Sequence, residues 1–174
     1  MENTNPQSKV LLISTGGTIE KTYNESDGSL ENKSSVIMQK ICNNIRIPYT
    51  DLDVEVILSK DSLYMDENDR KDICSYIEDR SSEGLPIVIL HGTDTMELTA
   101  NYCFEKIKNP KVPFIFTGAM MPLEFEKTDA VQNVTEALFA AKIIDPGFYI
   151  SFHNRLYQLP KVRKNRKQGT FESY

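Results

Sequence analysis

Continuous runs of apolar residues recur along the chain, at residues 10–13, 86–90 and 113–117. A run that is apolar on both faces is typical of a central strand in a parallel sheet covered on both sides. Residues 53–58 alternate before they become apolar, and residues 148–152 and 156–159 form two shorter runs around Asn154 and Arg155. These patterns predict three further strands, of which the last two form a hairpin.

Apolar residues at helical spacing lie between these strands, at residues 36–45, 66–77, 96–107 and 130–143. Polar side chains are positioned to cap three of these helices: Ser34 or Ser35, Asp94 or Thr95, and Thr128 with Asp129. Because strands and helices alternate, we predict an α/β fold. The expected architecture is a three-layer, doubly wound, mostly parallel sheet of the flavodoxin or Rossmann type.

The composition is that of an ordinary globular protein, because 40% of the 174 residues are hydrophobic and 26% are charged. A chain of this length buries one sizeable core, so we expect a single domain over residues 1–174. The net charge of −5 argues against nucleic acid as the main partner. No apolar run is long enough to cross a membrane, and the N-terminal residues are polar, so the cytoplasm is the default location.

The few cysteines and histidines limit the chemistry of the chain. Cys42, Cys74 and Cys103 are odd in number and lie in helical apolar patterns, so we expect buried thiols. His91 and His153 are the only histidines, and neither has a cysteine or carboxylate at ligand spacing, which argues against a zinc site. For His91 we expect a role in packing or in orienting the backbone.

Polar residues directly follow two of the buried strands. Gly16 and Gly17 precede Thr18, and Gly92 precedes residues 93–95, whose sequence is TDT. Ligands of open parallel sheets bind beyond the carboxyl ends of the strands, and glycines let a small substrate approach the backbone. The two segments therefore predict one pocket. A tight turn at the glycines and simple helix capping by the threonines are the competing interpretations.

The segments TGGTI (residues 15–19) and HGTDT (residues 91–95) resemble the two signature segments of the bacterial-type L-asparaginases. The resemblance continues in KDSLYM (residues 60–65), TGAMMP (residues 117–122) and VRKN (residues 162–165). It implies an amidohydrolase that converts L-asparagine to L-aspartate and ammonia through a threonine nucleophile and an acyl-enzyme, without a metal or organic cofactor. Long members carry a C-terminal domain that we do not expect here, so the chain resembles a short, single-domain branch.

The resemblance also implies catalytic roles for individual residues. Thr18 would attack the amide carbon, while Thr93, Asp94 and Lys164 would relay protons. Lys161 is the alternative to Lys164. Residues 20–33 form a polar, glycine-containing stretch that we expect to be a lid.

Within that lid, Tyr23 has two open interpretations: a hydrogen bond to the nucleophile, or an exposed loop residue. The residues implied in substrate binding are Gly17, Ser62, Gly92, Asp94 and Ala119. Ser62 would bind the α-carboxylate of the substrate and Asp94 its α-ammonium group.

Two departures from the family pattern leave the substrate open. Leu63 stands where the long extracellular enzymes have an amide. The glutamate that their C-terminal domain supplies would have to be replaced by a residue of the lid or of a partner subunit, and Glu20 and Glu25 are candidates by position. Besides the amidohydrolase, we keep two hypotheses: a catalytically silent amino-acid-binding relative, and the ammonia-supplying subunit of a tRNA-dependent amidotransferase. In the last case the basic stretch 161–167 would contact RNA. The resemblance also implies a homodimer or higher homo-oligomer acting on a small amide.

Overall fold

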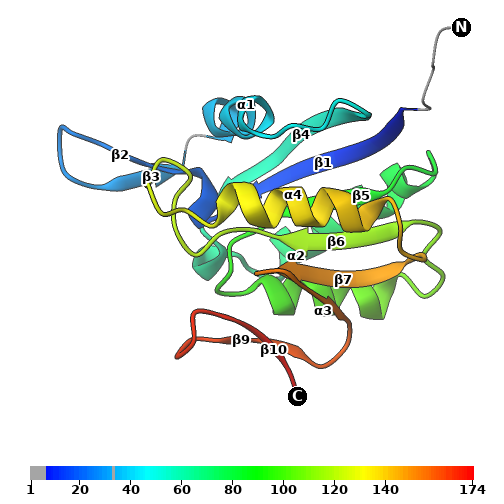
Figure 1. The fold of residues 1–174 in the computed structure, drawn as a ribbon. Coiled ribbons are helices and arrows are strands. Elements are labelled where there is room, and N and C mark those ends of the chain that lie inside the picture. Colours follow the sequence, from blue (N-terminus) through cyan, green and yellow to red (C-terminus); the bar gives the residue numbers. More distant parts are fainter. Residues whose placement is uncertain (1–6, 33) are drawn as a thin grey trace, which may run out of the picture.

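The computed structural model describes residues 7–32 and 34–174. Its centre is a six-stranded sheet in the order β4-β1-β5-β6-β7-β8 (Figure 1). The strands are β1 (Ser8–Gly16), β4 (Thr50–Lys60), β5 (Ile87–Leu90), β6 (Pro113–Thr117), β7 (Gly147–Phe152) and β8 (Arg155–Gln158). The first five are parallel, and β8 runs antiparallel to β7. Because β4 and β5 lie on opposite sides of β1, the strand order reverses between β1 and β5, which is the topological switch point.

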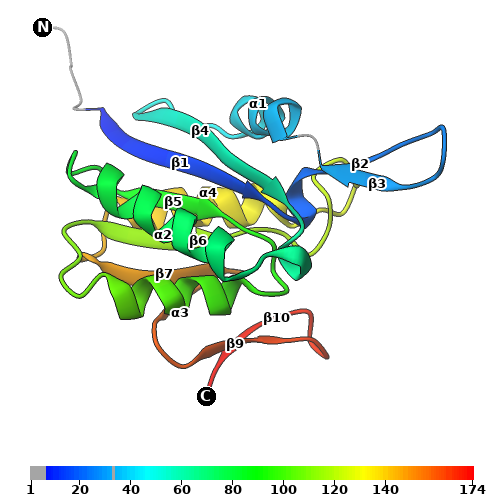
Figure 2. The same ribbon diagram turned by 180° about the vertical axis from the view of Figure 1, so that it is seen from behind.

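Helices cover both faces of the sheet (Figure 1 and Figure 2). On one face lie α1 (Ser34–Asn44) and α4 (Ala130–Ala141), and on the other lie α2 (Glu67–Ser81) and α3 (Met96–Lys106). Leu11 and Ile13 of β1 pack in the apolar cluster of α2 and α3, whereas Leu12 packs in the cluster of α1 and α4. The predicted three-layer, doubly wound α/β fold is therefore confirmed. None of the helices in the described ranges is both long and apolar enough to span a membrane.

Within the described ranges, two antiparallel hairpins stand outside the central sheet. A short 3-10 helix, η1 (Thr18–Glu20), leads from β1 into the hairpin of β2 (Lys21–Tyr23) and β3 (Leu30–Asn32), so the expected lid is a hairpin. It projects beyond the end of β1 (Figure 1).

The second hairpin consists of β9 (Val162–Asn165) and β10 (Thr170–Ser173) and lies beside α3 (Figure 2). Val162 and Phe171 anchor it, because both side chains are buried in the cluster of α2 and α3. The hairpin thereby carries Lys164 back toward the body of the molecule.

Several helix caps differ from the predictions. The Thr128 hydroxyl oxygen accepts the backbone N–H of Ala130 at 3.1 Å, as expected, but the Asp129 carboxylate makes no cap hydrogen bond. Thr95 occupies the N-cap position of α3, yet its hydroxyl donates to the carbonyl of Ser62 at 2.8 Å. Thr95 thus contacts a neighbouring loop, and the Asp129 carboxylate accepts the side-chain amide of Asn133 in α4 at 2.9 Å and backbone N–H groups of a neighbouring loop.

The remaining differences concern boundaries and burial. The strand predicted at residues 53–58 extends over Thr50–Lys60, because it pairs with β1 along its length. The helix predicted at residues 66–77 continues to Ser81, and the one predicted at 130–143 ends at Ala141. Cys42 is only half-buried, whereas Cys74 and Cys103 are buried as expected.

The last two predictions concern the turn before β8 and the cap of α1. The hairpin turn before β8 lies at His153 and Asn154, both with positive φ, one residue earlier than predicted. The side chains of Ser34 and Ser35, expected to cap α1, lie outside the described residues.

Candidate active site

The backbones at the ends of β1 and β5 lie in direct contact. A Cβ on Gly17 would stand 2.4 Å from the Cα of Gly92, and a Cβ on Gly92 would stand 2.6 Å from the Cβ of Ser62. Gly17 also has a φ of 95°, which L-residues rarely adopt. A larger residue at Gly17 would push the two strand ends apart, and one at Gly92 would collide with the Ser62 side chain. The contact brings the TGGTI segment, the HGTDT segment and Ser62 together at the switch point of the sheet.

Lys164 reaches this point from β9. Its Nζ lies 2.7 Å from Thr93 Oγ1 and 3.1 Å from Asp94 Oδ1, and its side chain is 12% exposed. Thr93 is buried as well, so the hydroxyl and the amine meet largely out of water. Lys161, the alternative lysine, is exposed. The structure therefore groups Lys164 with Thr93 and Asp94.

Asp94 is paired with two cations. Besides Lys164, Arg166 donates from its guanidinium to Asp94 Oδ1 at 2.6 Å. Burial by itself would raise the pKa of Asp94, but hydrogen bonds from Lys164 and Arg166, with their charges, outweigh burial and hold that pKa below its usual range. Asp94 is thus ionised at neutral pH. Burial raises the pKa of nearby Glu97, although its own backbone N–H, Arg166 and Lys164 act in the opposite direction.

Thr18 and Tyr23 lie differently with respect to this cluster. Thr18 follows Gly17 directly, begins η1 and is half-buried. Its position beside the contact of Gly17 and Gly92 places it next to the segment of Thr93. Tyr23, in contrast, is 58% exposed, and its hydroxyl lies across its own hairpin, 3.6 Å from the position of a Cβ on Gly28. The structure does not bring Tyr23 into the cluster of Lys164, Thr93 and Asp94.

The β2–β3 hairpin is tied to the Ser62 turn by an ion pair. Lys21 Nζ lies 2.6 Å from Asp61 Oδ2, and Asp61 also accepts the backbone N–H of Leu63 at 3.0 Å. Glu20 is fully buried and accepts the hydroxyl of Ser14, whereas Glu25 is exposed. Of the two positional substitutes for the family glutamate, Glu20 is therefore enclosed by protein.

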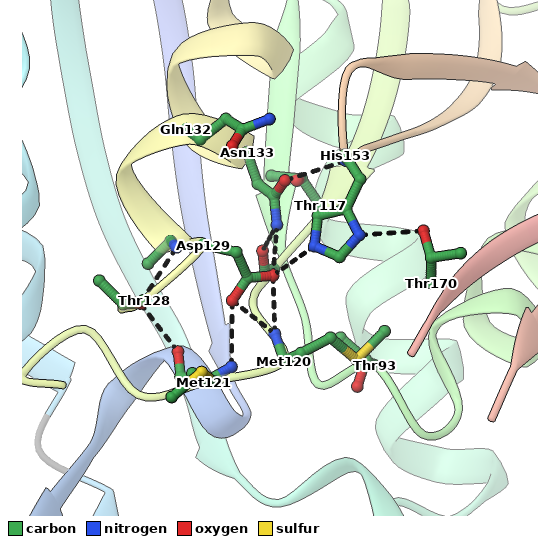
Figure 3. Close-up of polar contacts among 12 residues, drawn as sticks. Thr93, Thr117, Met120, Met121, Thr128, Asp129, Gln132, Asn133, His153 and Thr170 are labelled. Atoms are coloured by element: carbon green, nitrogen blue, oxygen red, sulfur yellow. Dashed lines mark hydrogen bonds and ion pairs between the residues drawn. The ribbon is translucent and has the colours of Figure 1, made fainter. Parts of the chain in front are cut away.

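Asp129 holds the loop that follows β6. Its carboxylate accepts the backbone N–H of Met120 at 3.0 Å and that of Met121 at 3.1 Å (Figure 3). In the same loop, Ala119 is buried, and the N–H of Leu123 donates to the carbonyl of Ile19 at 3.3 Å. This loop between β6 and α4 (residues 118–128), the pocket loop, thus lies against the segment that carries Thr18.

His91 orients backbone beneath the site, as expected. Its Nδ1 donates to the carbonyl of Gly92 at 2.8 Å, and its backbone N–H donates to the carbonyl of Thr117 at 2.9 Å. Burial lowers the pKa of His91 to about 4, so the ring is neutral at pH 7. A neutral imidazole keeps positive charge away from the buried strand ends.

Two residues of the site are not predicted by the sequence patterns. Arg166 belongs to a basic stretch that looks solvated, and it lies in the turn after β9, which ends at Asn165, so no strand periodicity assigns it to a side. Asp129 looks like a helix cap, and nothing local indicates that it binds the pocket loop.

The fold and the site define a class: a doubly wound α/β protein with threonine, lysine and aspartate side chains gathered at its topological switch point. The family model described as "Asparaginase, N-terminal" matches residues 9–174. The chain belongs to the asparaginase family and corresponds to its N-terminal domain.

Individual relatives agree with this assignment. An L-asparaginase of Thermococcus kodakarensis is 30% identical over 161 residues, which cover 92% of this chain and 49% of that protein. A solved structure of a thermostable L-asparaginase from the same organism superposes with a TM-score of 0.85 and 30% identity, covering 95% of this chain and 51% of that one. For L-asparaginase I from Vibrio cholerae the TM-score is 0.83 at 25% identity, covering 96% and 51%.

A second kind of relative also matches. A glutamyl-tRNA(Gln) amidotransferase subunit of Methanobrevibacter smithii is 27% identical over 177 residues, which cover 96% of this chain and 40% of that protein. The chain thus spans about half the length, or less, of the proteins it is compared with here.

Proposed function

We propose that this protein hydrolyses the side-chain amide of L-asparagine to L-aspartate and ammonia, with Thr18 as the nucleophile. The observation that carries the proposal is the position of Lys164, whose Nζ lies 2.7 Å from Thr93 Oγ1 and 3.1 Å from Asp94 Oδ1. A threonine hydroxyl needs a partner that takes its proton before it can attack a carbonyl carbon. A buried amine beside a second hydroxyl supplies such a route next to Thr18.

The reaction proceeds in two halves. The Thr18 oxygen bonds to the amide carbon, and its proton passes through Thr93 and Lys164 to the leaving nitrogen, which departs as ammonia. The resulting ester of Thr18 is then hydrolysed by water, and the relay returns the proton to the threonine. Backbone N–H groups beside Gly17 and Gly92 are the candidate donors to the oxyanion, and one such donor contributes about 3 kcal/mol in other hydrolases.

Asp94 and Ser62 are the proposed binding groups for the two charged ends of the amino-acid substrate. Asp94 is ionised and suits the α-ammonium group of an amino acid, while Ser62 is a candidate donor to the α-carboxylate. The assignment of Ser62 rests on its contact with Gly92. A role for Tyr23 requires the β2–β3 hairpin to move, because its side chain lies outside the cluster.

The test is ammonia release from L-asparagine up to about tens of millimolar, well above usual KM values, with L-glutamine in parallel. Turnover is expected in the wild type and in Thr135→Ala, a control on the exposed side of α4, and is expected to disappear in Thr18→Ala. Turnover that persists in Thr18→Ala would refute Thr18 as nucleophile. A folded wild type that binds L-asparagine without releasing ammonia would instead support the silent amino-acid-binding relative.

The second candidate function is the ammonia-supplying subunit of a tRNA-dependent amidotransferase. It is favoured by the similarity to the glutamyl-tRNA(Gln) amidotransferase subunit and by the exposed basic residues Arg163 and Lys167 of the β9–β10 hairpin. Binding of tRNA that weakens steeply with added salt would support it, and tRNA binding no tighter than that of an unrelated acidic protein would remove it.

The homo-oligomer and the cytoplasmic location remain predictions. Light scattering coupled to size-exclusion chromatography would test the first, with a single-chain mass of 19.9 kDa contradicting it. Cell fractionation would test the second.

A further inference from the structure

His153 bridges two segments that are far apart in the sequence. Its Nε2 lies 2.9 Å from Asp129 Oδ2, and its Nδ1 lies 3.0 Å from Thr170 Oγ1 (Figure 3). Because a carboxylate only accepts, Nε2 must carry a proton, and a neutral ring then accepts the hydroxyl of Thr170 at Nδ1. Both ring nitrogens are thus used, one on each side of the bridge.

One end of the bridge is the pocket loop. Asp129 accepts the backbone N–H groups of Met120 and Met121, so the imidazole and the loop share one carboxylate. The backbone of His153 adds a parallel connection, because its N–H donates to Asn133 Oδ1 at 3.0 Å, and Asn133 Nδ2 donates to the carbonyl of Gly118 at 2.9 Å.

The other end of the bridge is the hairpin that carries Lys164. Thr170 begins β10 and pairs with Asn165 of β9, while the next residue, Phe171, pairs with Lys164 itself. Phe171 also packs edge to face on Phe152, the neighbour of His153, with ring centroids 5.0 Å apart. The hydrogen bond from Thr170 to His153 therefore holds β10 next to the residue pair formed by Phe171 and Lys164.

We propose that His153 is a positioning residue, which holds the β9–β10 hairpin against the pocket loop and so sets Lys164 against Thr93. The inference rests on the proposed function, in which Lys164 relays the proton. Within the described ranges β9 and β10 form a two-stranded sheet of their own, so side-chain contacts tie the hairpin to the rest of the molecule. Val162 and Phe171 pack into the core, and the Tyr157 hydroxyl of β8 donates to the carbonyl of Phe171. The bond between Thr170 and His153 is the contact of β10 that leads to the pocket loop.

The experiment uses Thr170→Val, which keeps the shape of the side chain and removes the hydroxyl, with Thr135→Val as the matched control. The Thr135 hydroxyl bonds its own helix, at the carbonyl of Val131. We expect Thr170→Val to lower kcat for L-asparagine about tenfold and to change KM by less than about twofold. A displacement of a catalytic group by about 1 Å can lower the rate roughly hundredfold, so a smaller shift of Lys164 accounts for the tenfold loss. Substrate contacts remain, so a drop in kcat alone separates positioning from a general loss of structure.

Two further variants complete the design. His153→Leu removes both bonds and should also lower kcat, and the double variant with Thr170→Val should lose no more than His153→Leu alone, because both act through one contact. His153→Gln offers an oxygen to Thr170 and an N–H to Asp129 and should recover most of the rate. A Thr170→Val enzyme with the kcat of the wild type, or full additivity in the double variant, would overturn the inference.

Hydrogen exchange separates this inference from the proposed function. Amides of residues 162–173 should exchange faster in Thr170→Val than in the wild type and in Thr135→Val. If the wild type does not hydrolyse L-asparagine, the proposed function fails, and exchange alone decides the bridge. Unchanged exchange over residues 162–173 would then show that His153 does not hold the hairpin.

Discussion

Replacing Arg166 by glutamine is expected to strengthen the binding of L-asparagine. Arg166 lies 2.6 Å from the same Asp94 oxygen that Lys164 contacts at 3.1 Å. If Asp94 receives the α-ammonium group of the substrate, the guanidinium competes with it for one carboxylate. Removing Arg166 leaves Asp94 paired with Lys164 and opens its solvent side to the incoming ammonium group.

The size of this effect follows from the exposure of the arginine. The Arg166 side chain is 66% exposed, and an exposed ion pair contributes about 0.2–1 kcal/mol. At 1.4 kcal/mol for each factor of ten, the upper figure corresponds to about a fivefold decrease in KM. The value of kcat should stay within about twofold, because the proton relay of Thr93 and Lys164 remains in place.

The assay is the initial rate of ammonia release over a range of L-asparagine concentrations, at low and at high salt. Added salt screens the exposed pair, so the wild-type KM should approach that of Arg166→Gln as salt is raised. Arg163→Gln is the matched control, because Arg163 belongs to the same hairpin but pairs with Glu172. A higher KM in Arg166→Gln would refute the reasoning and assign Arg166 to the substrate carboxylate, and an equal change in Arg163→Gln would reduce the effect to net charge.

Three further outcomes are expected. Lys164→Met should lower kcat by about a hundredfold or more, as loss of a proton-transfer group does, whereas Lys161→Met should leave it unchanged; equal losses in both would remove the assignment of Lys164. Ser62→Ala should raise KM for L-asparagine by about tenfold or more, because a hydrogen bond to a charged group contributes about 1.5–3 kcal/mol; an unchanged KM would exclude Ser62 from carboxylate binding. His91 should make the fold sensitive to acid, because burial lowers its pKa from 6.5 to about 4. Above pH 6.5 the ring is neutral in both the folded and the unfolded chain. As the pH falls toward 4, the unfolded chain binds the proton first. The free energy of unfolding should therefore decrease by up to about 3 kcal/mol over that window, and urea unfolding should show a shallower decrease for His91→Gln.

The sheet could be predicted from the sequence because its signals are local. All five positions of β6 are buried, and its predicted bounds, Pro113–Thr117, match the structure. The meeting of the Thr18 and Thr93 segments also follows from a general rule, since neighbouring parallel strands present their carboxyl ends at one edge. A pattern of apolar runs followed by glycine and hydroxyl residues is therefore enough to place the two segments together.

The β9–β10 hairpin could not be predicted in this way. Its sequence is dominated by basic residues that look solvated, and it forms because Val162 and Phe171 pack into a cluster built by distant helices. Strand formation depends on such packing more than on the intrinsic preference of a segment. For the same reason, the basic stretch did not indicate that Arg166 would reach Asp94. Nor did the helix pattern indicate that Asp129 would hold the pocket loop.

The contact between Gly17 and Gly92 determines how this chain can vary in evolution. Gly17 has a positive φ and can gain a side chain only if the end of β5 moves, and Gly92 can do so only if Ser62 moves, so drift at these positions requires simultaneous changes that arise rarely. Thr18, one residue away, is only half-buried. In a library selected only for folded protein, positions 17 and 92 should stay glycine while position 18 diversifies, and selection for turnover should then fix position 18 as well. Comparing the two selections would distinguish the residues that build the pocket from the residue that reacts in it.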